Sequence, residues 1–334
     1  MNALTPFGNA GKARTRRARV VVITGASSGI GRATAEAFAR RGDRVVLAAR
    51  NELALRQVAD DCARAGAPAL AVPTDVTDED AVLALASRAA ERFGRIDVWV
   101  NNAAVMVYGL FERTPSAVHR RVIETNLFGY LHGARAALPH FRRQGHGILV
   151  NNASLYAKTT SPYVSAYIVS KFGILGFSEA LRQELHDAPD IHVCVILTGS
   201  VDTPIFRHTA NYAGRAGRPV PPVMDPQRVV RAILRCVEHP RPEITVGQTA
   251  RVLSWAHAVL PGLYDRSVPW VMDRAGLTRK PERDNPGNVF DPLPEPRDIR
   301  GGWGHRPGTV LARGAALLLT GAGATAVAVR RLRG

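Results

Sequence analysis

From residue 19 onward the chain alternates short runs of β-branched and other apolar residues with longer stretches of helical periodicity. The run RVVVITG (19–25) ends in glycine, and GRATAEAFARRG (31–42) follows it as an Ala-rich helix. Further strand-like runs are DRVVLAAR (43–50), PALAVPTDV (68–76), IDVWVNNA (96–103), GILVNNAS (147–154), IHVCVILT (191–198) and EITVG (243–247). Strands that are apolar on both faces and are separated by helices indicate a parallel sheet covered on both sides. We therefore expect a doubly wound α/β domain.

The regions outside this alternation differ in composition and suggest four segments. Residues 1–17 read as a basic N-terminal tail, and residues 18–250 form the α/β domain. Residues 251–308 form a C-terminal extension, in which 251–278 have helical character. The part 281–308 contains six Pro and five Gly and should form no regular element. Residues 309–334 are an apolar segment with a basic end.

The formal net charge of +16 is concentrated at the two ends of the chain. Residues 1–19 contribute +5 and residues 297–334 contribute +6, so the central region is close to balanced. Basic ends are typical of solvated tails and also suit anionic lipid or nucleic acid, but this distribution predicts no specific nucleic-acid partner.

The three cysteines have neither the number nor the spacing of a disulfide framework or a zinc site. They are Cys62, Cys194 and Cys236. A reducing compartment is the natural inference, and no metal site is expected. No apolar stretch follows the basic N-terminus, so the sequence predicts no secretory signal and a cytoplasmic location.

The stretch YIVSK (167–171) places a tyrosine one helical turn before a lysine. On a helix, residues at i and i+4 lie on one face, so the Lys171 ammonium could sit near the Tyr167 phenol. A phenol ordinarily has a pKa of about 10, and an adjacent cation favours its ionised form. The pair is therefore a candidate proton donor tuned toward neutral pH, although the same spacing also occurs by chance in helices.

The stretch ITGASSGIGRA (23–33) falls between the first predicted strand and the first predicted helix. Its glycines, Gly25, Gly29 and Gly31, would let the backbone turn tightly and approach a pyrophosphate. The N-terminus of the helix adds free N–H groups and a partial positive charge. This is the place where a doubly wound fold binds a dinucleotide.

Taken together, these motifs resemble the short-chain dehydrogenases/reductases, over about residues 18 to 250. TGASSGIG (24–31) is similar to the family's cofactor loop, DVTD (75–78) to its adenine-contact segment and NNAA (101–104) to its post-strand turn. Asn126 in ETNLFG, Ser154 and YIVSK follow in the family's order. The resemblance implies a Rossmann-type catalytic domain, a nicotinamide cofactor and a small-molecule carbonyl or alcohol substrate, expected to be apolar.

The resemblance also implies a role for each matching residue. Tyr167 would be the general acid/base, Ser154 would hold the substrate oxygen, and Lys171 would lower the phenol pKa and bind the nicotinamide ribose. Asn126 would position a water that links Lys171 to solvent. The residues expected to bind the cofactor are Thr24, Gly25, Ser27, Ser28, Gly29, Ile30, Gly31, Arg50, Asp75, Val76, Asn102, Ala103, Ala104, Tyr167, Lys171, Gly199, Val201 and Thr203.

Two positions depart from the family pattern. The usual Pro-Gly after the sixth strand reads Thr198-Gly199, which predicts a less rigid turn beside the nicotinamide, and the final Gly of the Asn-Asn-Ala-Gly turn is Ala104. Neither change removes a catalytic group. The substrate pocket should be bordered by residues after Ser154, by 106–108 and by the loop from about 204 to 222.

Arg50 stands at the end of the second predicted strand, where enzymes of this fold that use NAD tend to place an Asp. A guanidinium there suits a 2′-phosphate through charge-assisted hydrogen bonds, so we predict NADP(H) as the cofactor. A merely solvated Arg after a strand is the alternative.

Two other functions stay open, a non-catalytic dinucleotide-binding sensor and a membrane-surface adaptor on the same fold. The second depends on Thr309 to Val329, an apolar stretch interrupted only by Arg313. This stretch could span a membrane, lie on its surface, or pack on the protein or on a second subunit of a homo-oligomer. We predict peripheral membrane contact through 309–334, because the uncharged part is short and basic residues follow it.

Overall fold

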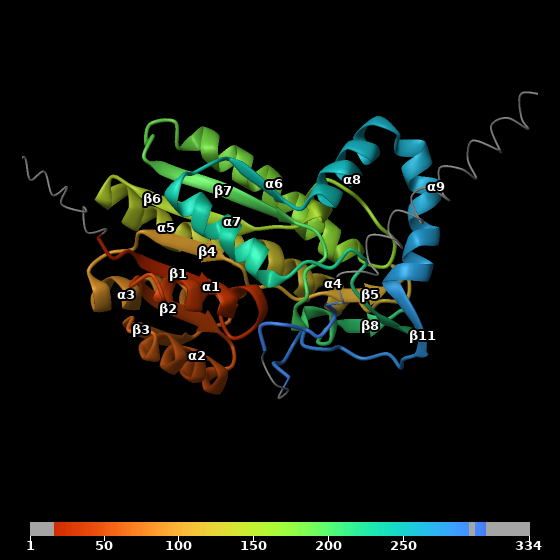
Figure 1. Cartoon of the computed structure of the whole chain (residues 1–334), viewed down its shortest axis with the longest axis horizontal. Coiled ribbons are helices and arrows are strands. Elements are labelled where there is room, and N and C mark those ends of the chain that lie inside the picture. Colours follow the sequence, from red (N-terminus) through yellow and green to blue (C-terminus); the bar gives the residue numbers. More distant parts are fainter. Residues whose placement is uncertain (1–16, 294–297, 305–334) are drawn as a thin grey trace, which may run out of the picture.

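The computed structural model describes residues 17–293 and 298–304, and its centre is a sheet of seven parallel strands (Figure 1). The strand order is β10-β7-β6-β4-β1-β2-β3. The strands are β1 (Val20–Thr24), β2 (Arg44–Ala49), β3 (Ala69–Pro73), β4 (Val98–Asn101), β6 (Gly147–Asn152), β7 (Ile191–Thr198) and β10 (Glu243–Val246). Each lies within a run predicted as a strand, and the doubly wound α/β fold is therefore confirmed.

The order in which successive strands are added to the sheet reverses beside β1. In register, Val22 of β1 pairs with Val46 of β2 on one side and with Trp99 of β4 on the other. The first three strands thus extend the sheet one way from β1, and β4, β6, β7 and β10 extend it the other way. A ligand crevice forms at such a switch point, outside the carboxyl ends of the strands.

Helices cover both faces of the sheet. On one face pack α1 (Gly29–Ala39), α2 (Glu52–Arg64) and α7 (Pro226–Glu238). The other face carries α3 (Glu79–Phe93), α5 (Gly129–Gln144) and α6 (Ser165–Glu184). Alternate residues of one strand serve the two cores: Val21 and Ile23 of β1 belong to the first, and Val20 and Val22 to the second.

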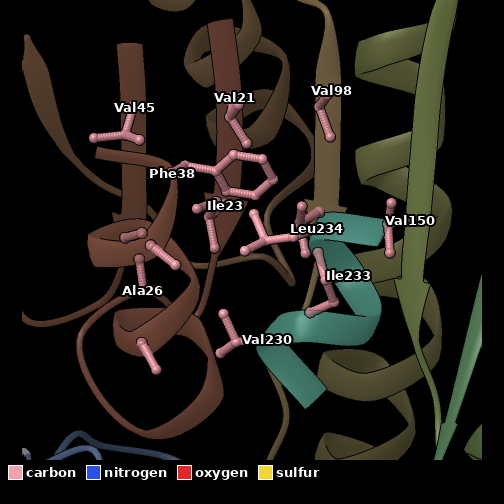
Figure 2. Packing of buried hydrophobic residues seen from close by; sticks show 14 of the residues in the cluster. Val21, Ile23, Ala26, Phe38, Val45, Val98, Val150, Val230, Ile233 and Leu234 are labelled. Atoms are coloured by element: carbon pink, nitrogen blue, oxygen red, sulfur yellow. The ribbon is translucent and has the colours of Figure 1, made fainter. Parts of the chain in front are cut away.

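The first core is shown in Figure 2, where strand side chains meet α1 and α7. Phe38 of α1 packs with Val21 of β1, and Ile233 and Leu234 of α7 fill the space beside Val150 of β6. Phe38 and Ile233 are fully buried. Full burial of one such side chain stabilises the fold by about 1.5–3 kcal/mol, so this layer holds α1, and with it the preceding loop, firmly on the sheet.

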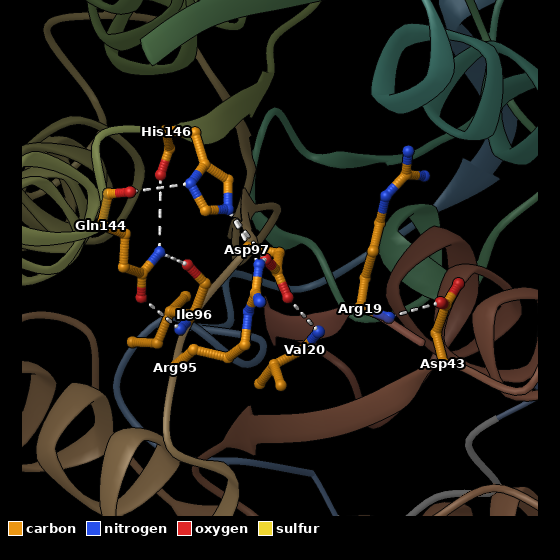
Figure 3. A network of polar contacts seen from close by, with 8 residues as sticks. All are labelled: Arg19, Val20, Asp43, Arg95, Ile96, Asp97, Gln144 and His146. Carbon is orange, nitrogen blue, oxygen red and sulfur yellow. Dashed lines mark hydrogen bonds and ion pairs between the residues drawn. The ribbon is translucent and has the colours of Figure 1, made fainter. Parts of the chain in front are cut away.

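Polar contacts fasten the amino end of the sheet (Figure 3). The Asp97 carboxylate, before β4, accepts a hydrogen bond of 2.8 Å from the Val20 N–H and contacts Arg95 and His146. Gln144 bonds both the N–H and the carbonyl of Ile96, at 3.0 and 2.6 Å. Because these groups tie β1, β4 and α5 together at the end away from the crevice, we assign them to stability rather than chemistry.

Short elements build up the carboxyl side of the sheet. The helix α4 (Ser116–Ile123) continues through a π-helical turn, η1 (Glu124–Phe128), into α5, and η2 (Leu155–Ala157) and η3 (Pro204–Phe206) are single 3₁₀ turns. The strand β5 (Val107–Gly109) pairs in parallel with β8 (Ala210–Tyr212), and β9 (Arg215–Gly217) pairs with β11 (Leu277–Pro281). These strands have three to five residues each, too few for a periodic sequence signal.

The C-terminal extension begins with two helices at one end of the molecule, beside β5, β8 and β11 (Figure 1). The helical prediction for 251–278 is confirmed as α8 (Gln248–Val259), α9 (Pro261–Val271) and the π-helical turn η4 (Met272–Gly276). Pro261 starts the second helix because proline suits a first helical position. The irregular region begins later than predicted: β11 includes Pro281, and Asn285 bridges to Asn211.

Candidate active site

The carboxyl ends of the parallel strands open into a cavity of about 720 Å³. All residues predicted to bind the cofactor line it except Thr24 and Gly31, and Ser154 lines it as well. The predicted substrate-side segments, after Ser154 and at 106–108 and 204–222, also contribute to its wall. Asn126 is absent from the lining.

The glycine-rich loop between β1 and α1 makes the tight turn that its sequence predicted. Gly25 has φ +65°, and a Cβ atom there would stand 2.7 Å from the Ala103 Cα. A Cβ at Gly31 would stand 2.1 Å from the Gly25 carbonyl oxygen, so Gly31 lets the loop close although it does not face the cavity. Thr24 also acts from behind, because its hydroxyl accepts the N–H groups of Asn102 (3.0 Å) and Ala103 (3.1 Å).

Arg50, at the end of β2, donates to three backbone carbonyls of the C-terminal extension. Nη1 reaches the oxygens of Val289 (3.3 Å) and Phe290 (2.6 Å), and Nη2 reaches that of Asn288 (2.6 Å). Burial lowers the pKa of Arg50, and the nearby Asp75 carboxylate opposes that shift. The guanidinium predicted to bind a 2′-phosphate is thus held at the edge of the cavity by protein contacts.

Asp75 is fixed by its own turn and by a neighbouring helix. Its carboxylate accepts bonds from the N–H (3.0 Å) and hydroxyl (2.9 Å) of Thr77, and Arg121 of α4 pairs with it at 2.5 Å. Burial would raise the pKa of Asp75, but the Thr77 hydrogen bonds and the Arg121 and Arg50 charges outweigh it and lower the pKa. The segment that lines the cavity at Asp75 and Val76 is therefore rigid and anionic.

Ser154, Tyr167 and Lys171 come together at the centre of the cavity. The Ser154 hydroxyl lies close enough to the Tyr167 phenol to lower its pKa, and it accepts the Tyr156 N–H at 3.2 Å. Lys171 lies one turn after Tyr167 on α6, with its Nζ 5.2 Å from the centre of the Tyr167 ring. The same Nζ donates to the carbonyl of Asn152 at 3.2 Å. The predicted i, i+4 pair therefore shares one helix face, directed at Ser154 on the neighbouring strand end.

Burial governs the acidities of this pair. It raises the pKa of Tyr167, and the hydrogen bond from Ser154 opposes the rise. Burial lowers the pKa of Lys171 to about 7. The expectation that Lys171 lowers the phenol pKa is therefore not met, because desolvation of the phenol outweighs attraction to an amine that burial itself tends to neutralise.

Asn126 lies in the π-helical turn η1 and is fully buried. Its side chain accepts from the N–H of Val105 (2.8 Å) and donates to the Val105 carbonyl (2.9 Å) and the Ser170 hydroxyl (3.4 Å). Among the described residues it makes no hydrogen bond to Lys171. In the described contacts the amide anchors Val105, which lines the cavity just before β5.

The turn after β7 is tied to the strand that carries Ser154. The Thr198 carbonyl lies 3.4 Å from the Ser154 Oγ, and the Thr198 hydroxyl lies 3.5 Å from the Ala153 carbonyl. The threonine that replaces the family's usual proline thus has its own contacts to β6. Gly199, Val201 and Thr203 follow along the cavity wall, as predicted.

Sequence reasoning missed three groups around the cavity. Tyr156 stands edge-on to Tyr167, with ring centres 6.2 Å apart. Helices α8 and α9 and the turn η4 supply an apolar wall that includes Leu253, Leu263 and Met272. The irregular extension contacts Arg50, as described above. Tyr156 lay in a segment already expected to border the pocket, whereas the extension carried no motif that could have placed it here.

The residues present fit a nicotinamide dinucleotide. The loop of 25–30 lines the cavity at the start of α1, and the N-terminus of a helix attracts anions. The Asn152 Oδ1 is buried on the cavity wall without a donor among the described residues, and a ribose hydroxyl could supply one. Such a cofactor would be held by the loop of 25–30 at its pyrophosphate and by Tyr167 and Lys171 at its nicotinamide ribose.

Comparison with known proteins identifies the class of the chain. The family model of the short chain dehydrogenases matches residues 19–212, more than half of the sequence. The chain therefore belongs to the short-chain dehydrogenase/reductase family, and it is an oxidoreductase that binds a nicotinamide dinucleotide and acts on a small molecule.

Individual relatives agree with this assignment. The chain is 35% identical to the uncharacterized oxidoreductase YxnA of Bacillus subtilis over 273 residues, which cover 81% of this chain and 77% of the relative. A short-chain dehydrogenase/reductase from Burkholderia phymatum in complex with NAD matches with a TM-score of 0.66 and 26% identity, covering 74% of this chain and 95% of the other. An alcohol dehydrogenase from Thermococcus sibiricus complexed with 5-hydroxy-NADP matches with a TM-score of 0.59 and 27% identity, covering 68% and 95%. The solved neighbours thus include complexes with both kinds of dinucleotide.

Within residues 17–293 and 298–304, no group of three or more His, Cys, Asp or Glu could hold a metal ion. None of the helices in these ranges is both long enough and apolar enough to cross a membrane. The segment 309–334, for which membrane contact was predicted, lies outside the described residues.

Proposed function

We propose that this chain is an NADP(H)-dependent oxidoreductase that interconverts a bulky, apolar carbonyl compound and the corresponding secondary alcohol. The observation that carries the proposal is the convergence of Ser154, Tyr167 and Lys171 in one cavity with the glycine-rich loop. A dinucleotide-binding sensor would need the loop but would have no use for these three side chains together. The bound nicotinamide supplies the hydride for reduction or accepts it for oxidation.

Tyr167 is the proposed general acid/base, because its phenol can move a proton at the substrate oxygen. Ser154, whose hydroxyl lies close to the phenol and lines the same cavity, is proposed to hold that oxygen. A pKa raised by burial favours the protonated phenol, the form needed to reduce a carbonyl at neutral pH. In the oxidative direction the phenolate would have to form, so a cation close to it becomes important.

Lys171 is proposed to bind the nicotinamide ribose and to support the phenolate. With its pKa lowered to about 7, the amine can take up or release a proton near neutral pH. Asn126 keeps its proposed place in the proton relay, although its side chain is engaged with Val105. Its contribution would then come through the π-helical turn that it occupies, a type of irregularity common at functional sites.

The preference for NADP(H) depends on Arg50. An Arg side chain has five N–H donors, and the described contacts show the Arg50 Nη atoms bonded to three carbonyl oxygens. Donors therefore remain for a 2′-phosphate, which would also offset the desolvation of the guanidinium. Asp75 lies nearby, and its carboxylate is already engaged with Thr77 and Arg121.

The wall of the cavity supports a bulky, apolar substrate. Beyond Tyr167 the lining is formed by aromatic and aliphatic side chains, including Tyr156, Phe206, Leu263 and Met272, which come from four different segments. Apolar surface of this kind is stabilised by covering it with an apolar ligand. A small, strongly polar substrate would leave most of the wall in contact with water.

The test is a turnover assay with the purified full chain. NADPH and NADH oxidation would be followed with alicyclic and long-chain ketones and with small, polar carbonyl compounds, and the reverse reaction with the matching alcohols. We expect NADPH and the bulky ketones to be preferred, and Arg50→Asp to shift the preference toward NADH. A clear preference of the unmodified chain for NADH would refute the cofactor assignment, and Tyr167→Phe supplies the inactive control.

A further inference from the structure

Residues 298–304 of the C-terminal extension pack against two segments that line the cofactor cleft, the start of α1 and residues 201–206. We propose that this segment, called the strap, retains the bound dinucleotide and that Asp202 is the positioning residue that fastens it. The inference rests on the proposed function only in taking a nicotinamide dinucleotide as the ligand. It adds a role for a carboxylate that lies between two predicted cofactor contacts, Val201 and Thr203.

Asp202 is the centre of a backbone anion-binding turn. Its Oδ1 accepts the N–H groups of Gly301 (3.0 Å) and Trp303 (2.7 Å), and its Oδ2 accepts that of Gly304 (3.1 Å). The residue is only 5% exposed. Hydrogen bonds to a carboxylate are roughly twice as strong as those between neutral groups, and three on one side chain define a single geometry.

The strap is pressed against the wall that faces the nicotinamide end of the cleft. A Cβ at Gly301 would stand 2.2 Å from the Thr203 carbonyl oxygen, so the two backbones are in direct contact. Trp303 packs edge-on against Phe206, with ring centres 6.2 Å apart, and Phe206 lines the cavity. Any displacement of the strap therefore loosens the segment 201–206.

The strap also contacts the pyrophosphate end. The Gly29 N–H, in the first turn of α1, donates to the Asp298 carbonyl at 3.0 Å. Ile299 packs on the core layer between the sheet and α1 and α7. One short segment thus joins the start of the phosphate-binding helix to the segment 201–206, which Gly29 itself approaches: a Cβ at Gly29 would stand 3.4 Å from the Thr203 Cβ.

An earlier part of the same extension acts at the adenosine end, where residues 288–290 bind Arg50. The extension therefore makes contact beside three regions of the predicted dinucleotide site. Gly29, Val201 and Thr203 line the cavity, so a strap that holds their segments in place should slow release. The loop itself keeps a second anchor, because the Asp202 N–H donates to the Met224 carbonyl at 2.8 Å.

The experiment measures dinucleotide release from the full chain. Protein loaded with NADPH would be mixed with excess NADP⁺, and the loss of nicotinamide fluorescence would be followed for the unmodified chain, Asp202→Ala and Asp202→Asn. Because three charge-assisted bonds are lost, Asp202→Ala should release NADPH at least about tenfold faster. Asp202→Asn keeps the oxygen that accepts two of the N–H groups and should fall between the two.

A strap-side variant tests the same contact without touching the carboxylate. Gly301→Ala should also speed release, because its methyl group cannot fit against Thr203. Gly176→Ala is the matched control, since a Cβ there meets nothing within 4 Å, and its release rate should equal that of the unmodified chain. Hydrogen exchange of the Gly301 and Trp303 amides, measured without dinucleotide, should be faster in Asp202→Ala.

The outcomes separate this proposal from the proposed function. Faster amide exchange with unchanged release would refute retention, and unchanged exchange would refute fastening by Asp202. Faster release from a chain that reduces no carbonyl in the panel would support the strap and refute the proposed activity. A chain that binds neither NADPH nor NADH would refute both.

Discussion

At the scale of the residue, burial shifts the pKa values of two side chains on adjacent turns of α6 in opposite directions: it raises the pKa of Tyr167 and lowers that of Lys171. Desolvation disfavours the phenolate of Tyr167 and the ammonium of Lys171, so both groups tend toward their neutral forms. The Ser154 hydroxyl lies close enough to the phenol to oppose the rise in its pKa, which places a second proton donor beside the proposed acid/base.

Replacing Tyr167 with Phe should abolish most of the activity without loss of the fold. The ring remains to pack against Tyr156, and only the transferable proton is lost. Turnover should fall at least about a hundredfold, the lower range for a lost acid/base group, while NADPH affinity stays close to normal. Steady-state kinetics and fluorescence titration of NADPH check both parts. Near-normal turnover of Tyr167→Phe would contradict the assignment.

Lys171 should make the stability of the ligand-free chain depend on pH. Its pKa falls from 10.5 in the unfolded chain to about 7 in the folded chain, so between these values the unfolded chain binds more protons. The free energy of unfolding should therefore rise with pH across this window, by up to about 1.4 kcal/mol per pH unit. The full gain in stability is present above the unfolded pKa of 10.5, where Lys171 is neutral in both states. It is lost as the pH falls to the folded pKa of about 7.

The comparison that isolates this effect is Lys171→Met, which keeps an unbranched side chain and cannot titrate. Urea unfolding at several pH values across the window should give a steeper rise for the unmodified chain than for the variant. Other groups that titrate there, such as Tyr and Cys, affect both proteins equally. Parallel curves would show that the buried amine does not lose its proton as expected.

At the scale of the element, the sequence predicted the strands that have a regular apolar pattern and the turn that is marked by glycines. The apolar runs placed all seven strands of the sheet, and the glycines at 25, 29 and 31 placed the phosphate loop. The small strands β5, β8 and β9 escaped because three residues show no periodicity. The contacts of Arg50 escaped for another reason: its partners are backbone carbonyls more than two hundred residues away, and a carbonyl has no side-chain signature.

The turn between β1 and α1 should tolerate no side chain at Gly31. In Gly31→Ala the new methyl group would stand 2.1 Å from the Gly25 carbonyl oxygen and 2.7 Å from the Asn102 Nδ2. The loop must open to relieve this clash, at a cost of about 1–3 kcal/mol in stability. Titration with NADPH should show at least about a tenfold loss of affinity. Unchanged affinity would mean that the closed loop is not what holds the pyrophosphate.

At the scale of the whole molecule, the family core is enclosed by an extension that sequence comparison with the core alone would leave out. The family model ends at residue 212, yet α8 and α9 form part of the cavity wall, residues 288–290 contact Arg50, and residues 298–304 contact Gly29 and Asp202. Substrate range and cofactor release are therefore expected to depend on residues outside the conserved unit of the fold. The composition of the chain changes at 250, and no motif in the extension after that point predicts these contacts.

The last 26 residues lie outside the described part, and their sequence predicts loose association with a membrane surface. A helix over the 21 residues 309–329 would be about 31 Å long, just enough for a bilayer core. Spanning is disfavoured because Arg313 interrupts the stretch and because three Arg after residue 329 would have to cross. A helix on the surface avoids that cost and places the same Arg on anionic lipid.

Cells expressing the full chain and a version ending at Pro307 would be fractionated at low and at high salt. We expect part of the full chain to sediment with membranes at low salt and to be released at high salt, because screening weakens the contact of Arg with lipid. The shortened version should stay in the supernatant under both conditions and should keep its NADPH oxidation, since the strap ends at residue 304. If both versions remain in the supernatant at low salt, the tail is no anchor; if the full chain resists high salt, it is held by more than surface charge.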